Sequence, residues 1–514
     1  MLPTPGSPEE LAAFAKLQAR LPDLFTKAVE DPRALQTVVV VPSLSLHPGE
    51  LAKITGVHHY EERLLYMLML LRRPQTHLVF VTSQPLNPSV IDYYLHLLSG
   101  VPGSHARKRL HLLNCLDASP IPLSAKILNR PLLQNRIRQA VPDLDGAHLS
   151  VFNSTPLERS LAVALGLPLY APDPALMDLG TKSGCRETFR EAGVLLPRGF
   201  ERLQDANDIV DALDDLKGHN PTLRKAVVKL NDGFSGEGNA VFRFTEDCPE
   251  QGRKAWIRSR LPQLEFVAPM ETWDTFEAKY EEMGGVVEEF VEGEIKESPS
   301  CQSRVNAVGE PMTISTHDQV LDGQVFLGCT FPAHDSYRMD VQEAGYRVAK
   351  VLASKGVIGR FATDFVSVKN PETHQWDHYA IEVNLRKGGT THPFLTLKFL
   401  TDGTYDYETG QFLTPTGRPK CYYASDTLQS DKYAGFSPDD LIDISVYHDL
   451  HFHGASERGV VFHLMGALSE FGKLGIVCIG DNQQQARFLY NKTVGVLDTE
   501  AERHHGDREP LGSG

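Results

Sequence analysis

The sequence predicts an α/β protein with an α+β middle part, and two patterns and the chain length carry this prediction. Apolar, β-branched runs alternate with helical stretches through residues 37–155, as in an open parallel sheet. From residue 225 onward, glycine-rich or polar turns join many of the apolar runs, which is typical of antiparallel strands. The 514 residues, 41% of them hydrophobic, suffice for about three domains with a core each.

The N-terminal layer is expected to hold four strands with helices between them. Its first strand, "TVVVVPSLS", has the continuous apolar character of a buried parallel strand. The strands are expected at 37–45, 77–85, 109–115 and 148–155, and helices at about 58–72 and 91–100. The apolar run "LLYMLMLLRRP" is shorter than the ~18 residues of a membrane span and ends in two arginines, so it predicts a buried helix.

The middle part begins with a helix in "LGTKSGCRETFREAG" and then becomes rich in strands. "KAVVKL" leads through a glycine-rich turn into a second strand, and "GGVVEEFVEGE" reads as a strand that breaks at Gly293. A polar helical segment is expected over about 248–283, and a hairpin with the turn "PETHQ" over 356–386. After it, 402–419 predicts a linker or surface loop, followed by a final α/β segment to about residue 499 and a frayed tail.

Charge and composition restrict the function. A net charge of −15 argues against general binding to nucleic acid or to anionic membranes, although a local basic pocket is still allowed. The N-terminus lacks the basic start and apolar core of a signal peptide. Seven scattered cysteines without a CxxC motif favour reduced thiols and argue against a zinc site. We therefore expect a soluble, cytoplasmic protein.

Three oxygen ligands lie on the two strands of the 356–386 hairpin. Asp364 stands among apolar residues of one strand, while Glu382 and Asn384, two residues apart, point to the same face of the other. A buried carboxylate is costly unless it is paired or binds a metal, and Mg²⁺ prefers one or two carboxylates together with phosphate oxygens. The alternative is a set of polar residues that only caps the hairpin.

Lys229 and a glycine-rich turn form a second candidate. "VVKLNDGFSGEGN" places Lys229 at a strand end, before Gly233, Gly236 and Gly238, and glycines let backbone amides approach an anion. No Gly-Lys-Ser/Thr follows, so this is not a Walker A loop. The alternative is an ordinary hairpin turn.

Two weaker signals complete the set. The acidic strand at 288–294 offers backbone groups to a purine and a carboxylate to a ribose, although a solvated strand end is the simpler explanation. Lys182, near the start of a helix, is unfavourable for the helix dipole but sensible beside an anion. Otherwise it is a surface lysine.

The order of these motifs resembles that of the ATP-grasp ligases over residues 37–400. Within them the chain is most similar to the peptide-ligase group typified by the pheganomycin peptide ligase, through "LGTKSG", "KLNDGFSGEGNAVF" and "EVNLRKGGTTHP". The resemblance implies an ATP-grasp fold with a Rossmann-like domain (1–150), a core (151–400) made of a lid (185–287) and a catalytic part (288–400), and a C-terminal segment (401–514).

The resemblance also implies roles for the residues singled out above. Lys182 and Lys229 would hold the ATP phosphates, and the loop from Asp232 to Gly238 would close over them. The loop residues concerned are Gly233, Ser235, Gly236 and Gly238. The strand from Glu288 through Glu289 and Phe290 to Val291 would read adenine, and Glu294 would bind the ribose. Asp364, Glu382 and Asn384 would bind Mg²⁺, with Mn²⁺ as an alternative.

One departure concerns the arginine that the D-alanine ligase pattern places two residues before the metal-binding Asp. That position is Ala362 here. Arg360, on the same strand face, and Arg386, just after Asn384, are the two candidates for the missing catalytic cation, and the sequence does not decide between them.

The implied activity is ATP-dependent ligation of a small carboxylate to an amine, amino acid or peptide through an acylphosphate. The alternatives are a ligase that uses a different nucleophile, and an ATP-binding sensor or scaffold without catalysis. We expect no nucleic-acid or membrane partner, with a homodimer left open. The C-terminal histidines 448, 451, 453 and 463 lack carboxylate or cysteine partners at ligand spacing, so packing is favoured over metal binding.

Overall fold

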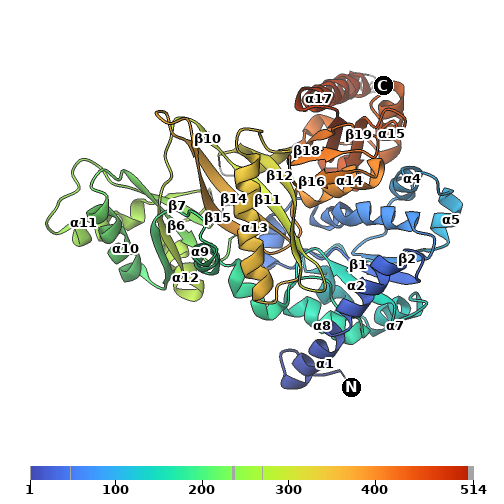
Figure 1. Cartoon of the computed structure of the whole chain (residues 1–514), viewed down its shortest axis with the longest axis horizontal. Helices are drawn as coiled ribbons and strands as arrows, with labels where there is room; N and C mark the ends of the chain where they lie inside the picture. The colour runs from blue at the N-terminus through green and yellow to red at the C-terminus, as the bar shows by residue number, and fades with distance from the viewer. Residues whose placement is uncertain (1, 47, 234–237, 269, 324, 507–514) are drawn as a thin grey trace, which may run out of the picture.

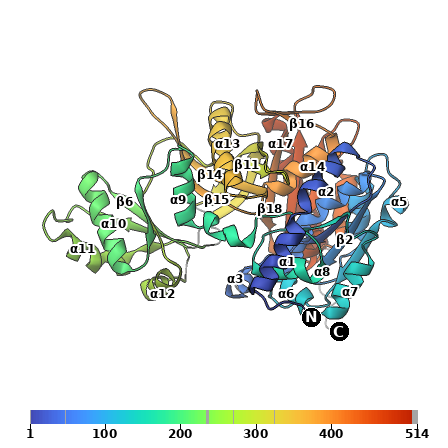
Figure 2. The same ribbon diagram turned by 60° about the horizontal axis from the view of Figure 1, so that its bottom comes forward.

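The computed structural model describes residues 2–46, 48–233, 238–268, 270–323 and 325–506. Sheets of four, five and nine strands and one two-stranded hairpin organise this part of the chain. The five-stranded sheet and its helices form a lobe at one end of the molecule, and the N-terminal layer and the C-terminal segment lie at the other (Figures 1 and 2). The nine-stranded sheet lies between them.

The N-terminal layer is a parallel sheet in the order β3-β2-β1-β4, which confirms the predicted α/β layer. Val39 and Val40 of β1 are both completely buried, on opposite faces of the sheet, which explains the continuous apolar run. The elements are α1 (Pro8–Gln18), α2 (Leu21–Glu30), β1 (Gln36–Val41), α3 (Pro48–Lys53), the 3₁₀ helix η1 (Val57–Arg72), β2 (Thr76–Thr82), α4 (Pro88–His96), α5 (Gly103–Arg107), β3 (Leu110–Asn114), α6 (Leu123–Leu128), α7 (Pro131–Gln139), β4 (Ala147–Val151) and α8 (Pro156–Leu165).

The five-stranded lobe has the order β5-β9-β6-β7-β8 with antiparallel pairing throughout. The expected helical segment at 248–283 is divided here, because the short strand β8 separates two helices. The elements from the connection onward are η2 (Pro174–Gly180), α9 (Lys182–Glu191), β5 (Gly199–Leu203), α10 (Ala206–His219), β6 (Lys225–Leu230), β7 (Asn239–Arg243), α11 (Arg253–Arg260), η3 (Leu261–Gln263), β8 (Glu265–Phe266), α12 (Trp273–Met283) and β9 (Gly285–Glu289).

The nine-stranded sheet runs β10-β14-β11-β12-β13-β18-β20-β19, with β15 also paired to β14. Its last three strands come from the C-terminal segment, which therefore extends the central sheet. The elements are β10 (Lys296–Glu297), β11 (Pro299–Val305), β12 (Pro311–Asp322), β13 (Val325–Phe331), α13 (Arg338–Ser354), β14 (Gly359–Lys369), β15 (Trp376–Asn384), α14 (Thr391–Thr401), β16 (Thr404–Asp406), β17 (Gln411–Leu413), β18 (Cys421–Gln429), η4 (Asp431–Tyr433), α15 (Pro438–Tyr447), β19 (Gly459–His463), η5 (Met465–Ala467), α16 (Leu468–Phe471), β20 (Lys473–Gly480) and α17 (Gln483–Gly506).

The expectation of a linker or surface loop over 402–419 is wrong for the part that pairs as strands. This stretch contains the hairpin β16–β17, in which Tyr405 and Phe412 are buried. Their rings lie 6.4 and 6.3 Å from the ring of Phe331 on β13. Two aromatic side chains buried against the sheet outweigh the glycine- and threonine-rich composition that suggested a loop.

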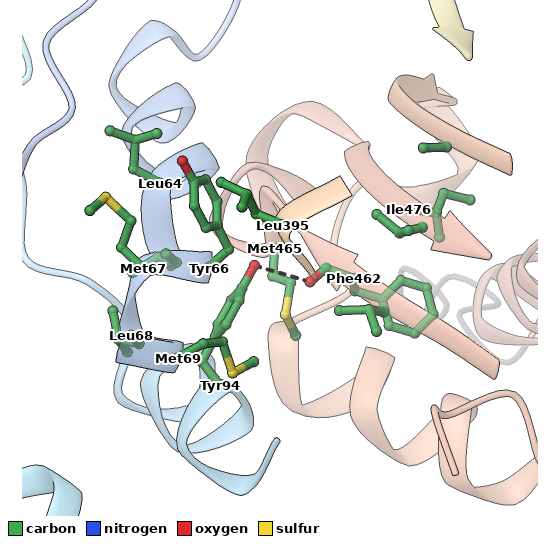
Figure 3. Packing of buried hydrophobic residues seen from close by; sticks show 14 of the residues in the cluster. Leu64, Tyr66, Met67, Leu68, Met69, Tyr94, Leu395, Phe462, Met465 and Ile476 are labelled. Carbon is green, nitrogen blue, oxygen red and sulfur yellow. Dashed lines mark hydrogen bonds between the residues drawn. The ribbon is translucent and has the colours of Figure 1, made fainter. Parts of the chain in front are cut away.

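The N-terminal layer and the C-terminal segment share one hydrophobic core (Figure 3). The buried run of η1 contributes Leu64 and Leu68, which belong to the same cluster as Met465 and Ile476. The Tyr94 hydroxyl of α4 donates to the carbonyl of Phe462 at 3.4 Å. Among the described residues, no helix is long and apolar enough to cross a membrane.

The chain passes from the five-stranded to the nine-stranded sheet between β9 and β10. At Gly293 in this connection, an added Cβ would approach Cγ1 of Val368 to 2.3 Å, so the close passage over β14 requires glycine. The connection places the ends of both sheets beside one another, and the candidate site lies there.

Candidate active site

The first turn of α9 brings Lys182 to the edge of the central sheet. Thr181 caps the helix by accepting from the Gly184 amide at 3.1 Å. Cys185, completely buried one residue further, accepts from the Val383 amide of β15 at 3.2 Å, and burial raises the pKa of its thiol to about 12. The helix is thus fixed to β15, and the ammonium of Lys182 lies 2.5 Å from Oε1 of Glu382.

A β-bulge places the three predicted metal ligands on one face. Asp364 pairs directly with Glu382, but Phe365 pairs with Ala380, so β15 carries one extra residue at this point. Ala380 and Val383, three residues apart, can therefore both enter the hydrophobic core below. Glu382 is left on the face of Asp364, two residues before Asn384.

The ligand atoms of this group are close to one another. Nδ2 of Asn384 donates to Oδ2 of Asp364 at 2.8 Å, which leaves the Asn384 carbonyl oxygen available for a cation. Burial, together with the Glu382 carboxylate, raises the pKa of Asp364 to about 6. Burial would also raise the pKa of Glu382, but the Lys182 ammonium holds it below its usual value. A divalent cation would relieve the repulsion between the two carboxylates.

Lys229 is held from the opposite side by Glu288. Its ammonium forms an ion pair with the carboxylate of Glu288 on the neighbouring strand β9. The second oxygen of Glu288 accepts from Arg186 of α9 at 2.5 Å. Burial opposes ionisation of Glu288, but Lys229 and Arg186 keep its pKa below the usual value. The carboxylate therefore acts as a buried anchor for two cations.

Asn231 connects the lobe to α9. Its carbonyl oxygen accepts from the Lys182 amide and its side-chain oxygen from the Ser183 amide, both at 3.0 Å. Its side-chain nitrogen donates to the carbonyl of Met283 at 2.9 Å. Neither Asn231 nor Arg186 was expected at the site from the sequence. Arg186 follows Lys182 by four residues, so helical spacing was a usable signal for it.

In the segment 288–291, which was expected to bind adenine through its backbone, two of the amides already have partners. The amides of Glu289 and Phe290 donate to the carbonyls of Arg198 and Lys225, at 2.8 and 3.1 Å. A purine contact to the amides of this segment would therefore fall on Val291 rather than on those two residues. The side chain of Glu294, assigned to the ribose, is exposed. The strand itself ends at Glu289, before the predicted break.

The glycine-rich turn connects β6 to β7. The carbonyl of Gly238 accepts from the Leu230 amide at 2.9 Å, and a Cβ on Gly233 would lie 3.2 Å from Gly238. The ends of the turn are therefore close together, next to Lys229. Ser235 and Gly236 lie outside the described residues.

The two candidate arginines have different surroundings. Arg386 lies within electrostatic reach of Glu382 and Asp364, and its guanidinium stands 5.9 Å from the ring centre of Phe152. Arg360 instead pairs across the strands with Arg304. The structure thus brings Lys182, Lys229, Glu288, Asp364, Glu382, Asn384 and Arg386 together, and it places Arg360 further along β14.

The donor set fits Mg²⁺ bound together with nucleotide phosphates. Two carboxylates and one amide oxygen converge, with two lysines beside them. The part of the chain that the structure describes contains no group of three His, Cys, Asp or Glu side chains suited to a metal. Phosphate oxygens would therefore have to complete the coordination. Of the C-terminal histidines, His448 pairs with Glu500, and the ring of His463 packs against that of His392 in a tilted arrangement.

Two family models match the chain. One is described as IQCH-like, ATP-grasp and covers residues 259–408, and the other is the PGM1 C-terminal domain at residues 440–493. The L-propargylglycine–L-glutamate ligase of Streptantibioticus cattleyicolor is 28% identical over 462 residues, or 88% of this chain and 92% of that protein. IQ motif-containing protein H of Danio rerio is 20% identical over 548 residues, 95% of this chain but 51% of that protein, so the chain spans about half its length.

Solved structures show the same architecture. The ADP complex of N5-carboxyaminoimidazole ribonucleotide synthetase aligns with a TM-score of 0.50 at 11% identity, covering 91% of this chain and 98% of that one. Biotin carboxylase from Campylobacter jejuni aligns with a TM-score of 0.51 at 12% identity, covering 88% and 90%. At such identities the likeness concerns the fold, and it confirms the fold expected from the motifs.

Proposed function

Because this chain is a member of the ATP-grasp family, we propose that it is an ATP-dependent carboxylate–amine ligase that forms an amide or peptide bond. The observation that carries the proposal is the convergence of Asp364, Glu382 and Asn384 with Lys182 of helix α9 and Lys229 of the five-stranded sheet. A module that only binds ATP does not require a pair of carboxylates next to two lysines that can contact phosphate groups.

In the proposed reaction, Lys182 and Lys229 bind the phosphates of ATP. Each ammonium now pairs with a carboxylate, so nucleotide binding exchanges or shares these partners. Asp364, Glu382 and Asn384 would hold Mg²⁺, with Mn²⁺ as an alternative, and the metal would neutralise charge on the transferring phosphoryl group.

Two steps then join the substrates. An oxygen of the substrate carboxylate attacks the γ-phosphorus, the bond to the bridging oxygen breaks, and ADP leaves. The amine nitrogen attacks the acyl carbon of the acylphosphate, the bond from carbon to the phosphate oxygen breaks, and the amine loses a proton. Arg386 is the proposed cation for the acylphosphate, because it lies next to both carboxylates. Water must be excluded from this intermediate, and we assign that task to the loop from Asp232 to Gly238.

The proposed substrates are small carboxylates and amines of the amino-acid type. The printed name of the Streptantibioticus cattleyicolor relative names two amino acids as its substrates. A non-amino-acid nucleophile is the alternative within the same chemistry. The proposal includes a cytoplasmic location, where Mg-ATP is available.

Amine-dependent release of ADP tests the proposal. The full chain is incubated with Mg-ATP and pooled amino acids and small peptides, ADP is measured, and new masses are read from the mixture. A ligase gives ADP and a product lighter by one water than its two substrates together. Binding of ATP without amine-dependent release of ADP would favour the alternative of an ATP-binding sensor or scaffold instead. Glu382→Gln serves as the inactive control.

A further inference from the structure

Four cations without a carboxylate partner lie beside the proposed ligase site, and we call them the cation pocket: Arg304, Arg360, Lys387 and Lys398. In the described part of the chain, none of them is within 4.0 Å of an Asp or Glu oxygen. The lysines of the nucleotide site, by contrast, both have such partners. The chain has 66 acidic and 51 basic residues, so acidic residues are in excess. The lack of a carboxylate partner for these four described cations is therefore unexpected.

Two of these cations face each other across neighbouring strands. Arg304 of β11 and Arg360 of β14 are direct partners in the antiparallel ladder. Like charges at such positions are destabilising. The same ladder pairs Ser300 with Asp364, four residues further, so the arginine pair and the metal carboxylate share one face. Four residues of strand span roughly 13 Å, about the length of an extended amino-acid or dipeptide substrate.

Two of these cations contact neutral groups. Nε of Arg304 donates to the hydroxyl of Tyr170 at 2.6 Å, and its guanidinium lies 5.6 Å from the ring centre of Phe25. The ammonium of Lys387 donates to the carbonyl of Val151 in β4 and lies 3.4 Å from the Ser150 hydroxyl.

Arg360 is surrounded by tyrosines and by the other cations of the pocket. Tyr66, labelled in Figure 3, and Tyr407 lie within electrostatic reach of it. The structure gives its guanidinium no hydrogen-bond or ion-pair partner among the described residues, and the same is true of the Lys398 ammonium.

Such a cluster destabilises the free protein. Burial, with Arg360 nearby, lowers the pKa of Lys387 to about 7, and burial, with Arg360 and Arg304, lowers that of Lys398. Arg304, Arg360 and Lys387 are half-buried, whereas Lys398 is exposed. Half-buried cations without counter-ions are costly, and guanidinium groups are suited to planar, two-oxygen anions. A ligand that supplies negative charge accounts for both facts.

We propose that the cation pocket binds a second anionic group of the substrate, a carboxylate or phosphate other than the carboxyl group that reacts at the metal. The substrate class is therefore a molecule with two anionic groups, such as a dicarboxylic or phosphorylated amino acid. This inference rests on the proposed ligase function for the identity of the reacting group, but the binding of the dianion does not require turnover.

Thermal unfolding of the full chain with Mg-ADP tests the pocket. The probes with two anionic groups, called dianionic below, are L-glutamate, L-aspartate and O-phospho-L-serine, and the matched probes with one anionic group are L-glutamine and L-alanine. We expect a dianionic probe to raise the melting temperature and the matched probes at equal concentration to leave it unchanged. Glutamate or aspartate acting more strongly than phosphoserine identifies a carboxylate pocket, and the reverse order identifies a phosphate pocket.

Arg360→Gln supplies the second arm. It should weaken binding of the dianionic probe roughly 10- to 100-fold. It should leave the melting temperature of the ligand-free protein equal or higher, because like-charge repulsion is relieved. Arg503→Gln, an exposed arginine on α17, is the control that keeps the ligand shift. A fall in the ligand-free melting temperature with Arg360→Gln would indicate a structural role and overturn the proposal.

Two further results would overturn it: equal shifts with glutamine and glutamate, or no shift with any anion. The proposed function fails separately. Binding of a dianionic probe without amine-dependent release of ADP would contradict the proposed ligase function but support the cation pocket. Amine-dependent release of ADP only with amino acids that carry a single anionic group would contradict the cation pocket but support the ligase function.

Discussion

The ammonium nitrogen of Lys182 lies 2.5 Å from Oε1 of Glu382, which joins the first turn of α9 to the metal edge of β15. The pair keeps both side chains ordered, but each is assigned to another ligand in the proposed reaction. Nucleotide binding must therefore offset the loss or sharing of this contact. Substitution of either residue should act on catalysis more than on folding.

Glu382→Gln should leave the melting temperature near that of the wild type and lower ligase turnover by at least ~10². The amide keeps the size of the side chain and can still contact Lys182, so no cavity forms, while the metal loses an anionic ligand. ADP release at saturating Mg²⁺ measures the effect. Glu372→Gln, in the exposed turn between β14 and β15, is the matched control. Retention of more than about a tenth of the turnover would mean that Glu382 only caps the strand.

Lys229→Ala and Arg186→Ala should separate binding from stability, although both residues contact Glu288. Loss of Lys229 should nearly abolish ADP production while Arg186 still neutralises the carboxylate. Loss of Arg186, which is 3% exposed, removes contacts to Glu288, Glu201 and the Pro197 carbonyl and should cost about 3–5 kcal/mol of unfolding free energy. ADP assays and urea denaturation measure the two effects. Equal destabilisation by both variants would contradict this division.

Asp364→Asn should stabilise the ligand-free protein and abolish turnover. The pKa of Asp364 is raised to about 6 in the folded state, mainly by burial, so above that pH the folded protein carries a carboxylate that it disfavours. The ionised Asp364 carboxylate therefore costs the folded state about 2–3 kcal/mol at pH 7. This cost disappears as the pH falls through 6 toward the pKa of an aspartate in the unfolded chain. Urea denaturation of both proteins should therefore show a gain at pH 7 that vanishes near pH 4. An equal gain at both pH values would show that charge is not the cause.

Much of the fold could be predicted from local pattern. The four apolar runs of the N-terminal layer alternate with helical stretches and so indicate a parallel sheet, and the hairpin of β14 and β15 is marked by its turn. What could not be predicted depends on contacts distant in sequence. The hairpin β16–β17 forms because Tyr405 and Phe412 pack against Phe331. The sequence of 402–419 alone does not predict a contact with Phe331.

The residues of the candidate site also differ in whether local sequence pattern could predict them. Asp364, Glu382 and Asn384 could be grouped from strand periodicity, and the bulge between them changed their surroundings but not their common face. Glu288 was assigned by its backbone, whereas its side chain anchors Lys229 and Arg186. Asn231 and Arg304 act through partners on other elements, so they were not found. Arg360 and Arg386 looked equivalent by spacing, and only their neighbours distinguish them.

Arg386→Ala should leave Mg-ATP binding nearly unchanged and slow formation or use of the acylphosphate by 10²–10³. The guanidinium lies within reach of Glu382 and Asp364 and donates to the Lys387 carbonyl at 3.3 Å. Burial lowers its pKa, although both carboxylates oppose this, and an arginine stays charged throughout the working range. Because Lys182 and Lys229 remain in the variant, nucleotide affinity measured by calorimetry should be retained. The acylphosphate can be trapped with hydroxylamine in a single turnover and measured as the hydroxamate, with Arg503→Ala as the control. A loss of nucleotide affinity that equals the loss of rate would reassign Arg386 to the phosphates of ATP. Unchanged trapping would remove it from the chemistry altogether.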